Sequence, residues 1–189
     1  MKVLVFCFLL LSLISCQPSV PISMTDSRLE LVNGELQLDS KPFTGICDYT
    51  DELNQTECAI PYRNGRKHGL VSSYYSDGTL AEQRLYDNGI KVGMHQGWWP
   101  SGQLKFELYF DKKGRYHGGV KEWFPNGQLL KSLNYQRGRE EGPQKMWDRN
   151  GKIRANYVAL KGDRFGLIGL KKCRSVRENS ENSTSNETD

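Results

Sequence analysis

The chain contains few of the side chains that usually carry out enzyme chemistry. Only three of its 189 residues are histidines: His68, His95 and His117. The metalloprotease pattern HExxH, the nucleophile pattern GxSxG and the phosphate-binding loop are missing from the sequence. His68 and His117 share one position of a repeat, but two repeats separate them, which is too far for one metal ion. We therefore expect a protein that is not an enzyme and holds neither a cofactor nor a metal ion.

Long hydrophobic runs are scarce as well. Residues 3–14 form the only such run, and it is too short to cross a bilayer as a helix. It follows Lys2 and ends before Ser15, so residues 1–15 are predicted to be a secretory signal peptide. Residues 13–16 resemble the bacterial lipobox, which implies cleavage before Cys16 and acylation of Cys16. The alternative is an ordinary secretory signal with an incidental cysteine.

The lipobox resemblance implies attachment to a membrane through the N-terminal lipid. Residues 16–28, which include Pro18 and Pro21, are predicted to be an acylated tether. Position 17 is Gln rather than Asp, which favours the outer membrane of a bacterial cell envelope. A secreted protein is the alternative location, and the sequence does not indicate an oligomeric state.

Glycine, in contrast, is abundant and regularly spaced. Fifteen of the 19 glycines fall into three series with steps of 24 or 25 residues. The series are Gly45, Gly69, Gly93, Gly118, Gly142 and Gly166; Gly65, Gly89, Gly114, Gly138 and Gly162; and Gly78, Gly102, Gly127 and Gly151. Glycines fixed in phase indicate turns, where the backbone needs a conformation that other residues avoid.

Each repeat has the pattern of a β-hairpin. In residues 118–142, an alternating segment is followed by Asn126-Gly127, a strong hairpin-turn signal, and by a second segment with apolar residues at alternate positions. A single hairpin cannot bury its apolar face, so the copies must stack on one another. We therefore predict an all-β fold of tandem antiparallel hairpins, about 24 residues each, in an elongated twisted sheet.

The copies resemble the MORN repeat, in the variant form found in many bacterial proteins. They read GLVSSYYSDGTL, GMHQGWWPSGQL, GGVKEWFPNGQL and GPQKMWDRNGKI. The resemblance covers residues 45–166 and identifies the type of repeat, and many bacterial chains of this kind have antitoxin-like names. Residues 29–44 are predicted to be a capping hairpin, residues 45–172 the repeat array and residues 175–189 a disordered tail.

Two cysteines lie in the degraded first repeat. Cys47 and Cys58 correspond to positions 71 and 82 of the next hairpin, which are expected on opposing strands. In a secreted protein a disulfide between them would reinforce the terminal repeat. Two free thiols or a metal pair are the alternatives, and Cys173 is left as an odd cysteine.

The distribution of charge points to an anionic partner. Residues 61–177 hold 23 Lys and Arg against 10 Asp and Glu, whereas residues 17–60 have a net charge of −6 and residues 178–189 of −4. A basic array fits a protein partner or an anionic membrane or cell-wall surface. The basic side chains could also simply keep exposed strands soluble. The export signal argues against nucleic acid.

We expect a non-catalytic, lipid-anchored binding protein, with toxin or effector neutralisation as the alternative function. Trp98, Trp123 and Trp147 share one phase, which predicts a core column. Trp99 and Phe124 occupy the next phase, so alternation predicts that they face the opposite side, where they form an exposed patch. The alternative is that neighbouring side chains shelter these rings and both faces are partly buried. The predicted binding residues are Trp99, Phe124, Arg115, Lys121 and Arg139.

Overall fold

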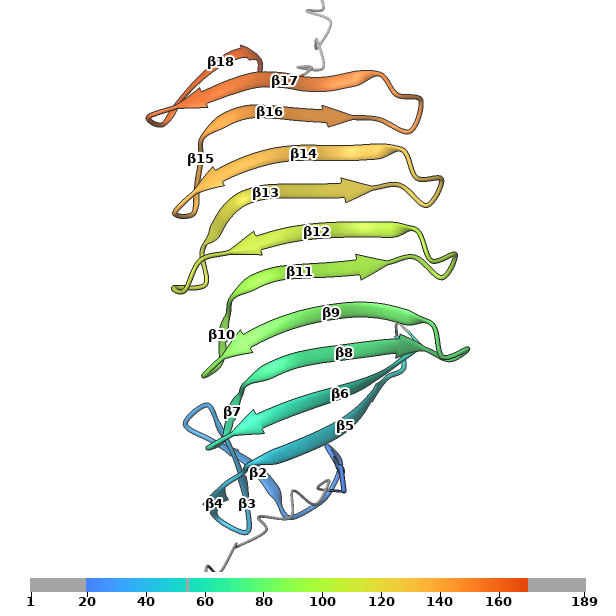
Figure 1. Ribbon diagram of the computed structural model, residues 1–189, viewed down its shortest axis with the longest axis vertical. Helices are drawn as coiled ribbons and strands as arrows, with labels where there is room; N and C mark the ends of the chain where they lie inside the picture. The colour runs from blue at the N-terminus through green and yellow to red at the C-terminus, as the bar shows by residue number, and fades with distance from the viewer. Residues whose placement is uncertain (1–19, 54, 170–189) are drawn as a thin grey trace, which may run out of the picture.

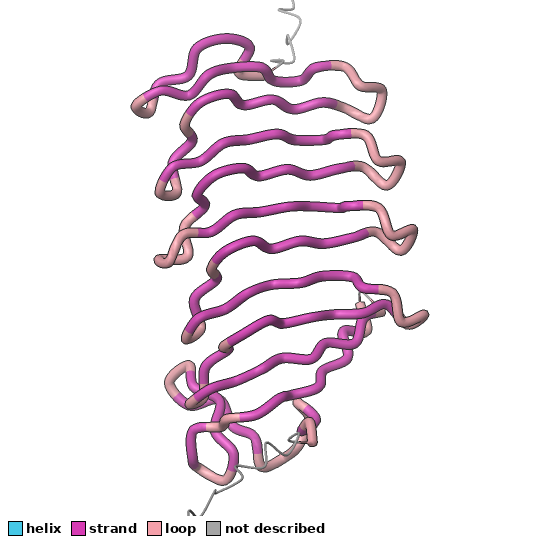
Figure 2. The backbone as a smooth tube through the Cα atoms, viewed as in Figure 1, coloured by secondary structure: helices cyan, strands magenta, loops and turns pink. Residues whose placement is uncertain are grey.

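The computed structural model describes residues 20–53 and 55–169, and these residues form only strands, turns and loops. Figure 1 shows the strands crossing the molecule one after another along its long axis, and Figure 2 shows the connecting turns. Within the described part of the chain, no helix is long and apolar enough to span a membrane. The strands are β1 (Ile22–Ser23), β2 (Leu29–Val32), β3 (Glu35–Leu38), β4 (Lys41–Pro42), β5 (Gly45–Asp51), β6 (Thr56–Arg63), β7 (Arg66–Lys67), β8 (Gly69–Tyr75), β9 (Leu80–Asp87), β10 (Ile90–Lys91), β11 (Gly93–Trp98), β12 (Leu104–Phe110), β13 (Tyr116–Trp123), β14 (Leu129–Gln136), β15 (Arg139–Glu140), β16 (Gly142–Trp147), β17 (Ile153–Leu160) and β18 (Asp163–Leu167).

Fifteen of these strands form one sheet, and the three strands β2, β3 and β4 form a second, small sheet. The main sheet runs β1-β5-β6-β8-β9-β11-β12-β13-β14-β16-β17-β18, so strands pair in chain order. All pairs are antiparallel except β1 with β5. The predicted all-β fold of tandem hairpins in an open sheet is therefore confirmed.

The sheet has two kinds of turn, which alternate along the chain, and each kind lies on one of the two long edges (Figure 1). The hairpin turns, residues 76–78, 100–102, 125–127 and 149–151, connect the two long strands of each repeat. In each, the residue before the turn donates its N–H to the carbonyl oxygen of the residue after it, as Phe124 does to Gln128 over 2.8 Å. Only the glycine has a positive φ, 81° at Gly127, so these are three-residue turns rather than the two-residue turn that Asn126-Gly127 suggested.

The closing turns, residues 64–65, 88–89, 112–114, 137–138 and 161–162, lead from one repeat to the next along the opposite edge. Four of them have two residues, both with positive φ, as in a type I′ turn; Asn88 and Gly89 have φ of 47° and 85°. The turn at residues 112–114 has one more residue, and the Asp111 N–H closes it on the Arg115 carbonyl. This extra residue accounts for the single 25-residue step in the glycine series.

One face of the sheet carries nearly all the buried side chains, and we call it the inner face. Facing residues of successive strands line it in register: Val120 opposes Leu133, and Gln144 opposes Tyr157. Leu133 is 7% exposed and Tyr157 4% exposed. Of the apolar positions predicted for the second strands, Leu133, Ala155, Tyr157 and Ala159 are buried, whereas Ile153 is 42% exposed. Gly97 lies on the inner face, and the ring of Phe106 on the facing strand occupies the space that a Cβ atom of residue 97 would fill.

At two junctions between hairpins, a buried polar side chain replaces missing strand pairing. Strands β9 and β11 pair only at Gln96 and Gly97, near the hairpin turns. Beyond that point, His95 Nε2 lies 2.9 Å from the Leu85 carbonyl oxygen. Between β14 and β16, Gln144 holds both the N–H and the carbonyl of Asn134, at 3.1 Å and 2.7 Å. His95 and Gln144 are both fully buried. They provide hydrogen-bond partners for backbone groups that lose theirs where the strands splay apart.

The N-terminal end is capped by the small sheet. Strands β2 and β3 form the hairpin expected at residues 29–38. Leu36 and Phe43 pack with Cys47 in a buried cluster. The closing turn at Gly65 is held by the cap, because its N–H donates to the Phe43 carbonyl and its own carbonyl accepts from the Leu36 N–H. The C-terminal end differs, since β18 is exposed along its whole length.

Candidate functional site

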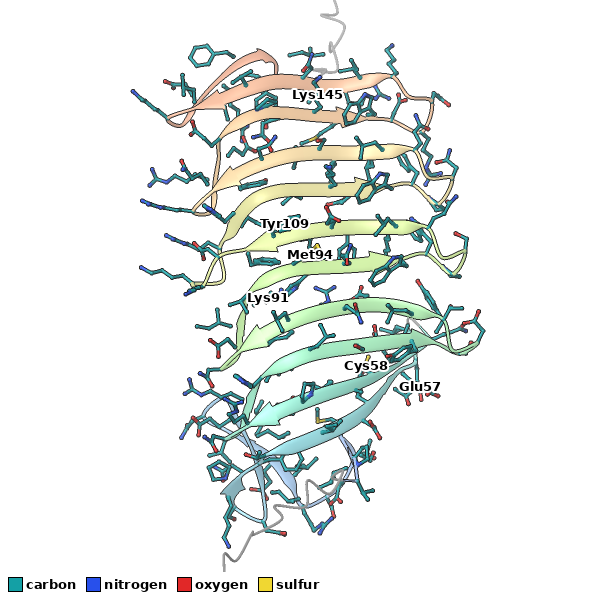
Figure 3. The ribbon with its side chains drawn as sticks, viewed as in Figure 1. Glu57, Cys58, Lys91, Met94, Tyr109 and Lys145 are labelled. Atoms are coloured by element: carbon teal, nitrogen blue, oxygen red, sulfur yellow. The ribbon has the colours of Figure 1, made fainter. Side chains whose placement is uncertain are left out.

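The closing turns carry a strong excess of positive charge. We define the closing edge as these turns with their flanking residues: 63–68, 87–92, 111–117, 136–141 and 161–165. It has eleven basic and five acidic side chains, a net charge of +6. Figure 3 shows nitrogen-tipped side chains projecting outward from this edge. The basic residues are Arg63, Arg66, Lys67, Lys91, Lys112, Lys113, Arg115, Arg137, Arg139, Lys161 and Arg164.

The opposite edge has no such excess. The hairpin edge, residues 75–79, 99–103, 124–128 and 148–152, contains two aspartates and two basic residues, Arg149 and Lys152. Asp77 and Asp148 accept hydrogen bonds from backbone N–H groups within their own turns, at 2.9–3.0 Å. These carboxylates therefore stabilise turns. The positive charge of the array is concentrated on one of its two long edges.

Some closing-edge cations are used within the fold. Lys67 Nζ lies 5.6 Å from the centre of the Tyr86 ring, and Lys91 Nζ lies 5.8 Å from that of Phe110. Asp111 pairs with Arg115 at 2.7 Å, and this hydrogen-bonded guanidinium lowers the pKa of Asp111 to about 2. Asp111 is therefore ionised at neutral pH. The cations left over are those that a partner can reach.

Three closing-edge residues without such partners line a hollow of about 510 Å³. Within the described residues, Arg137, Arg139 and Lys161 form no ion pair. Arg115, Gln136, Glu140, Glu141 and Gly162 complete its wall. We call this space the turn hollow. It lies between successive closing turns and brings together cations from three repeats.

The structure brings together two of the five predicted binding residues. Arg115 and Arg139 both line the turn hollow. Lys121 is exposed on the outer face of the sheet, where it opposes Glu107 on one side and Ser132 on the other. Trp99 and Phe124 lie on the hairpin edge, across the full width of the sheet from the arginines. The five residues therefore do not form one surface.

The expected exposed aromatic column is wrong. Trp99 and Phe124 are half-buried, and the Trp99 Nε1–H donates to the Trp123 carbonyl over 3.2 Å. Tyr75, at the same phase, donates its hydroxyl to the Trp98 carbonyl over 2.7 Å. Tyr75 and Trp99 thus each connect their hairpin to the next one. The tryptophans predicted as a core column, Trp98, Trp123 and Trp147, are also only half-buried.

His68 and His117 have the same structural role at their shared phase. The Nδ1 atom of each accepts the backbone N–H of the next closing turn, from Asn88 and Arg137 respectively, both at 3.4 Å. Among residues 20–53 and 55–169, no group of three His, Cys, Asp or Glu side chains is placed to hold a metal ion.

The predicted disulfide is not formed in the structure, where Cys47 and Cys58 are both free. Cys47 opposes Ile60, and Cys58 opposes Tyr49, so the two cysteines are diagonal neighbours rather than a facing pair. Burial raises the pKa of the Cys47 thiol to about 11, which keeps it protonated and unreactive. Cys16 and Cys173 lie outside the described residues.

A single open sheet of stacked β-hairpins, with its buried side chains on one face, defines a β-repeat protein. The family described as MORN repeat variant matches residues 67–88, 91–112, 116–137 and 140–157. The chain is a MORN repeat protein, and the matched segments coincide with the four complete hairpins, β8–β9 to β16–β17. Repeats of this family are generally associated with binding or interaction. No curated protein matches the chain.

Proposed function

We propose that the protein is a non-catalytic binding scaffold of a bacterial cell envelope, anchored by a lipid on Cys16, whose closing edge contacts an anionic surface. The supporting observation is the charge difference between the two edges, +6 on the closing edge and zero on the hairpin edge. A row of turns along one edge can meet a surface at several points together. Each basic residue near an anionic bilayer contributes about 1 kcal/mol.

The lipid on Cys16 and the basic closing edge would both contribute to attachment at an anionic surface. Several acyl chains on Cys16 would give firm attachment where one chain binds only marginally, and the basic closing edge would then determine which side of the array meets the anionic surface. Ile22 and Ser23, inside the predicted tether of residues 16–28, pair with Cys47 and Asp48 of β5, so only the residues before β1 would let the array turn its closing edge toward the bilayer or the cell wall.

The experiment for the closing edge compares two matched double variants in a Cys16→Ala background, which removes the acylated residue. Lys112→Glu with Lys113→Glu reverses two charges in a three-residue turn on the closing edge. Arg149→Glu with Lys152→Glu reverses two charges at a turn of the same kind on the hairpin edge. Sedimentation with phosphatidylglycerol vesicles is expected to be lost for the first pair only, and binding by the parent to weaken as salt is raised. Equal loss in both pairs would contradict a directional surface.

The anchor is tested separately, in the otherwise unchanged chain. Cys16→Ala is expected to move the protein from the detergent phase to the aqueous or unprocessed fraction. Unchanged detergent partitioning would reject the lipid anchor. Neutralisation of a toxin or effector, the alternative function, predicts instead that an acidic protein is captured equally well with and without vesicles present.

A further inference from the structure

The turn hollow combines unpaired positive charge with a concave, open shape. Its acidic wall is partly neutralised, because Glu140 accepts hydrogen bonds from the Tyr157 hydroxyl at 3.0 Å and from Arg164 Nε at 2.9 Å. Arg115 is fixed by Asp111, and its stem lies against Gly138. Glu141 is then the one acidic side chain of the wall without an ion pair in the described residues, against three unpaired cations on the same wall. A ligand with two or more negative charges would balance this excess.

Two of these cations occupy backbone positions that disfavour them. Arg137 and Lys161 have φ of 52° and 53°, in the left-handed region. At the same position, two other closing turns have Asn64 and Asn88, the residue type that accepts this conformation most readily after glycine. Long basic side chains therefore replace asparagine here at a cost in backbone energy. Strain of this kind concentrates at binding sites.

From this charge, shape and strain we propose that the turn hollow is a binding site for a phosphate group, with Arg137, Arg139 and Lys161 as its ligating cations. Arginine presents a planar set of donors that fits two oxygen atoms at once, and lysine adds a point charge. The Gln136 side chain offers an amide donor on the same wall. A volume of about 510 Å³ exceeds that of a single ion, so the phosphate belongs to a larger molecule or to a chain of phosphates.

The proposal deepens the proposed function, since it places a specific ligand group within the closing edge. The two are tested with different probes. Inorganic pyrophosphate, titrated calorimetrically into the full chain in detergent, reports on the turn hollow alone. Phosphatidylglycerol vesicles report on the whole closing edge, and phosphatidic acid vesicles, which carry a terminal phosphate, show whether the hollow takes its phosphate from a lipid.

The decisive variant is Arg137→Asn with Lys161→Asn, which installs the residue found at Asn64 and Asn88. We expect pyrophosphate affinity to fall tenfold or more while the midpoint of urea unfolding stays the same or rises. Arg149→Asn with Lys152→Asn, on the hairpin edge, is the control and is expected to change neither quantity by a comparable amount.

The outcomes separate the two proposals. Loss of vesicle binding in Lys112→Glu with Lys113→Glu, with pyrophosphate binding kept, supports a distinct hollow. If the parent chain binds pyrophosphate but does not bind any of the vesicles, the proposed function is contradicted and the phosphate site in the turn hollow is supported. A parent chain that does not bind pyrophosphate, or a double asparagine variant that binds it undiminished, overturns the phosphate site.

Discussion

Phe43 and Tyr62 lie 6.1 Å apart, ring centre to ring centre, and the same pair of positions is in contact in later repeats. The partners are always 19 residues apart. Lys67 lies over Tyr86, Lys91 lies over Phe110, and Tyr116 packs against Tyr135 at 5.2 Å. The first residue precedes a glycine of the Gly45 series by two positions, and the second is the last or next-to-last residue of the second long strand of the hairpin. A cation or an aromatic ring at the first position therefore packs on the ring at the second position and covers the end of each hairpin.

The buried histidine predicts a pH dependence. Burial lowers the pKa of His95, and the Leu85 carbonyl opposes this effect while Arg84 and Lys91 add to it. Because the folded state favours the neutral ring, the stability contribution is present above the unfolded pKa, about 6.5, and is lost as pH falls below it. His95→Gln, which copies Gln144, is expected to reduce the loss of stability between pH 7.5 and pH 5 in urea unfolding. An identical pH profile in this variant would contradict the role given to His95.

The closing turn of the cap contains a strained serine. Ser40 has φ of 61° and is exposed, at the phase where the repeats have Gly65 and Gly89. Ser40→Gly is expected to raise the free energy of unfolding by about 0.5–1 kcal/mol, after allowing for the entropy glycine adds to the unfolded chain. Ser101→Gly, in a hairpin turn where φ is not positive, is the control and is expected to lower it. A loss in both variants would mean that Ser40 carries no strain.

Phe106 determines why position 97 is glycine. A Cβ atom on Gly97 would lie 2.3 Å from the Phe106 ring, although the backbone there needs no special conformation. Gly97→Ala is expected to cost about 1–3 kcal/mol by overpacking. Adding Phe106→Leu is expected to recover part of this loss, because the smaller side chain leaves room for the methyl group. Additive losses in the double variant would show that the two positions do not interact.

The indole of Trp99 connects two repeats by one hydrogen bond. Trp99→Phe removes that donor, and Phe124 shows that the position accepts a phenyl ring. We expect a loss of about 1 kcal/mol in stability. Binding to anionic vesicles is expected to stay unchanged, because Trp99 lies on the hairpin edge. Weaker vesicle binding without loss of stability would return Trp99 to the binding surface, as the sequence had suggested.

The periodic glycines were sufficient to predict the hairpins, their order and both sets of turns. Each phase corresponds to one backbone requirement, and turns with positive φ set the repeat length. The exact turn types were less accessible. Asn126-Gly127 suggested a two-residue turn, and the structure has a three-residue turn, because the first strand ends earlier than the alternation indicated.

The exposure of the aromatic residues was missed for a definite physical reason. In each hairpin the strand register shifts next to the first aromatic of the pair, as between Gly97 and Trp98. Simple alternation across two faces fails beyond such a bulge, so Trp99 could not be placed by counting. The cysteines lie on opposing strands, as predicted, but the register sets Cys47 opposite Ile60 and Cys58 opposite Tyr49, so they do not face each other.

The basic edge was visible in the sequence only as an average charge. Its concentration on one edge became clear once the closing turns had been placed on the same side of the sheet. A signal was available, because most of the basic residues lie near the Gly65 series of glycines. The strain at Arg137 and Lys161 could not be recognised without backbone angles.

The single longer closing turn at residues 112–114 has a consequence for the history of the array. One inserted residue is accommodated within that turn, and the strands on both sides keep their neighbours. Because each hairpin pairs only with the strands before and after it, a whole unit can be duplicated or deleted in frame between equivalent glycines. The length of the protein, and with it the number of basic turns along the edge, can therefore change by unequal recombination while the cap at Gly65 is inherited intact.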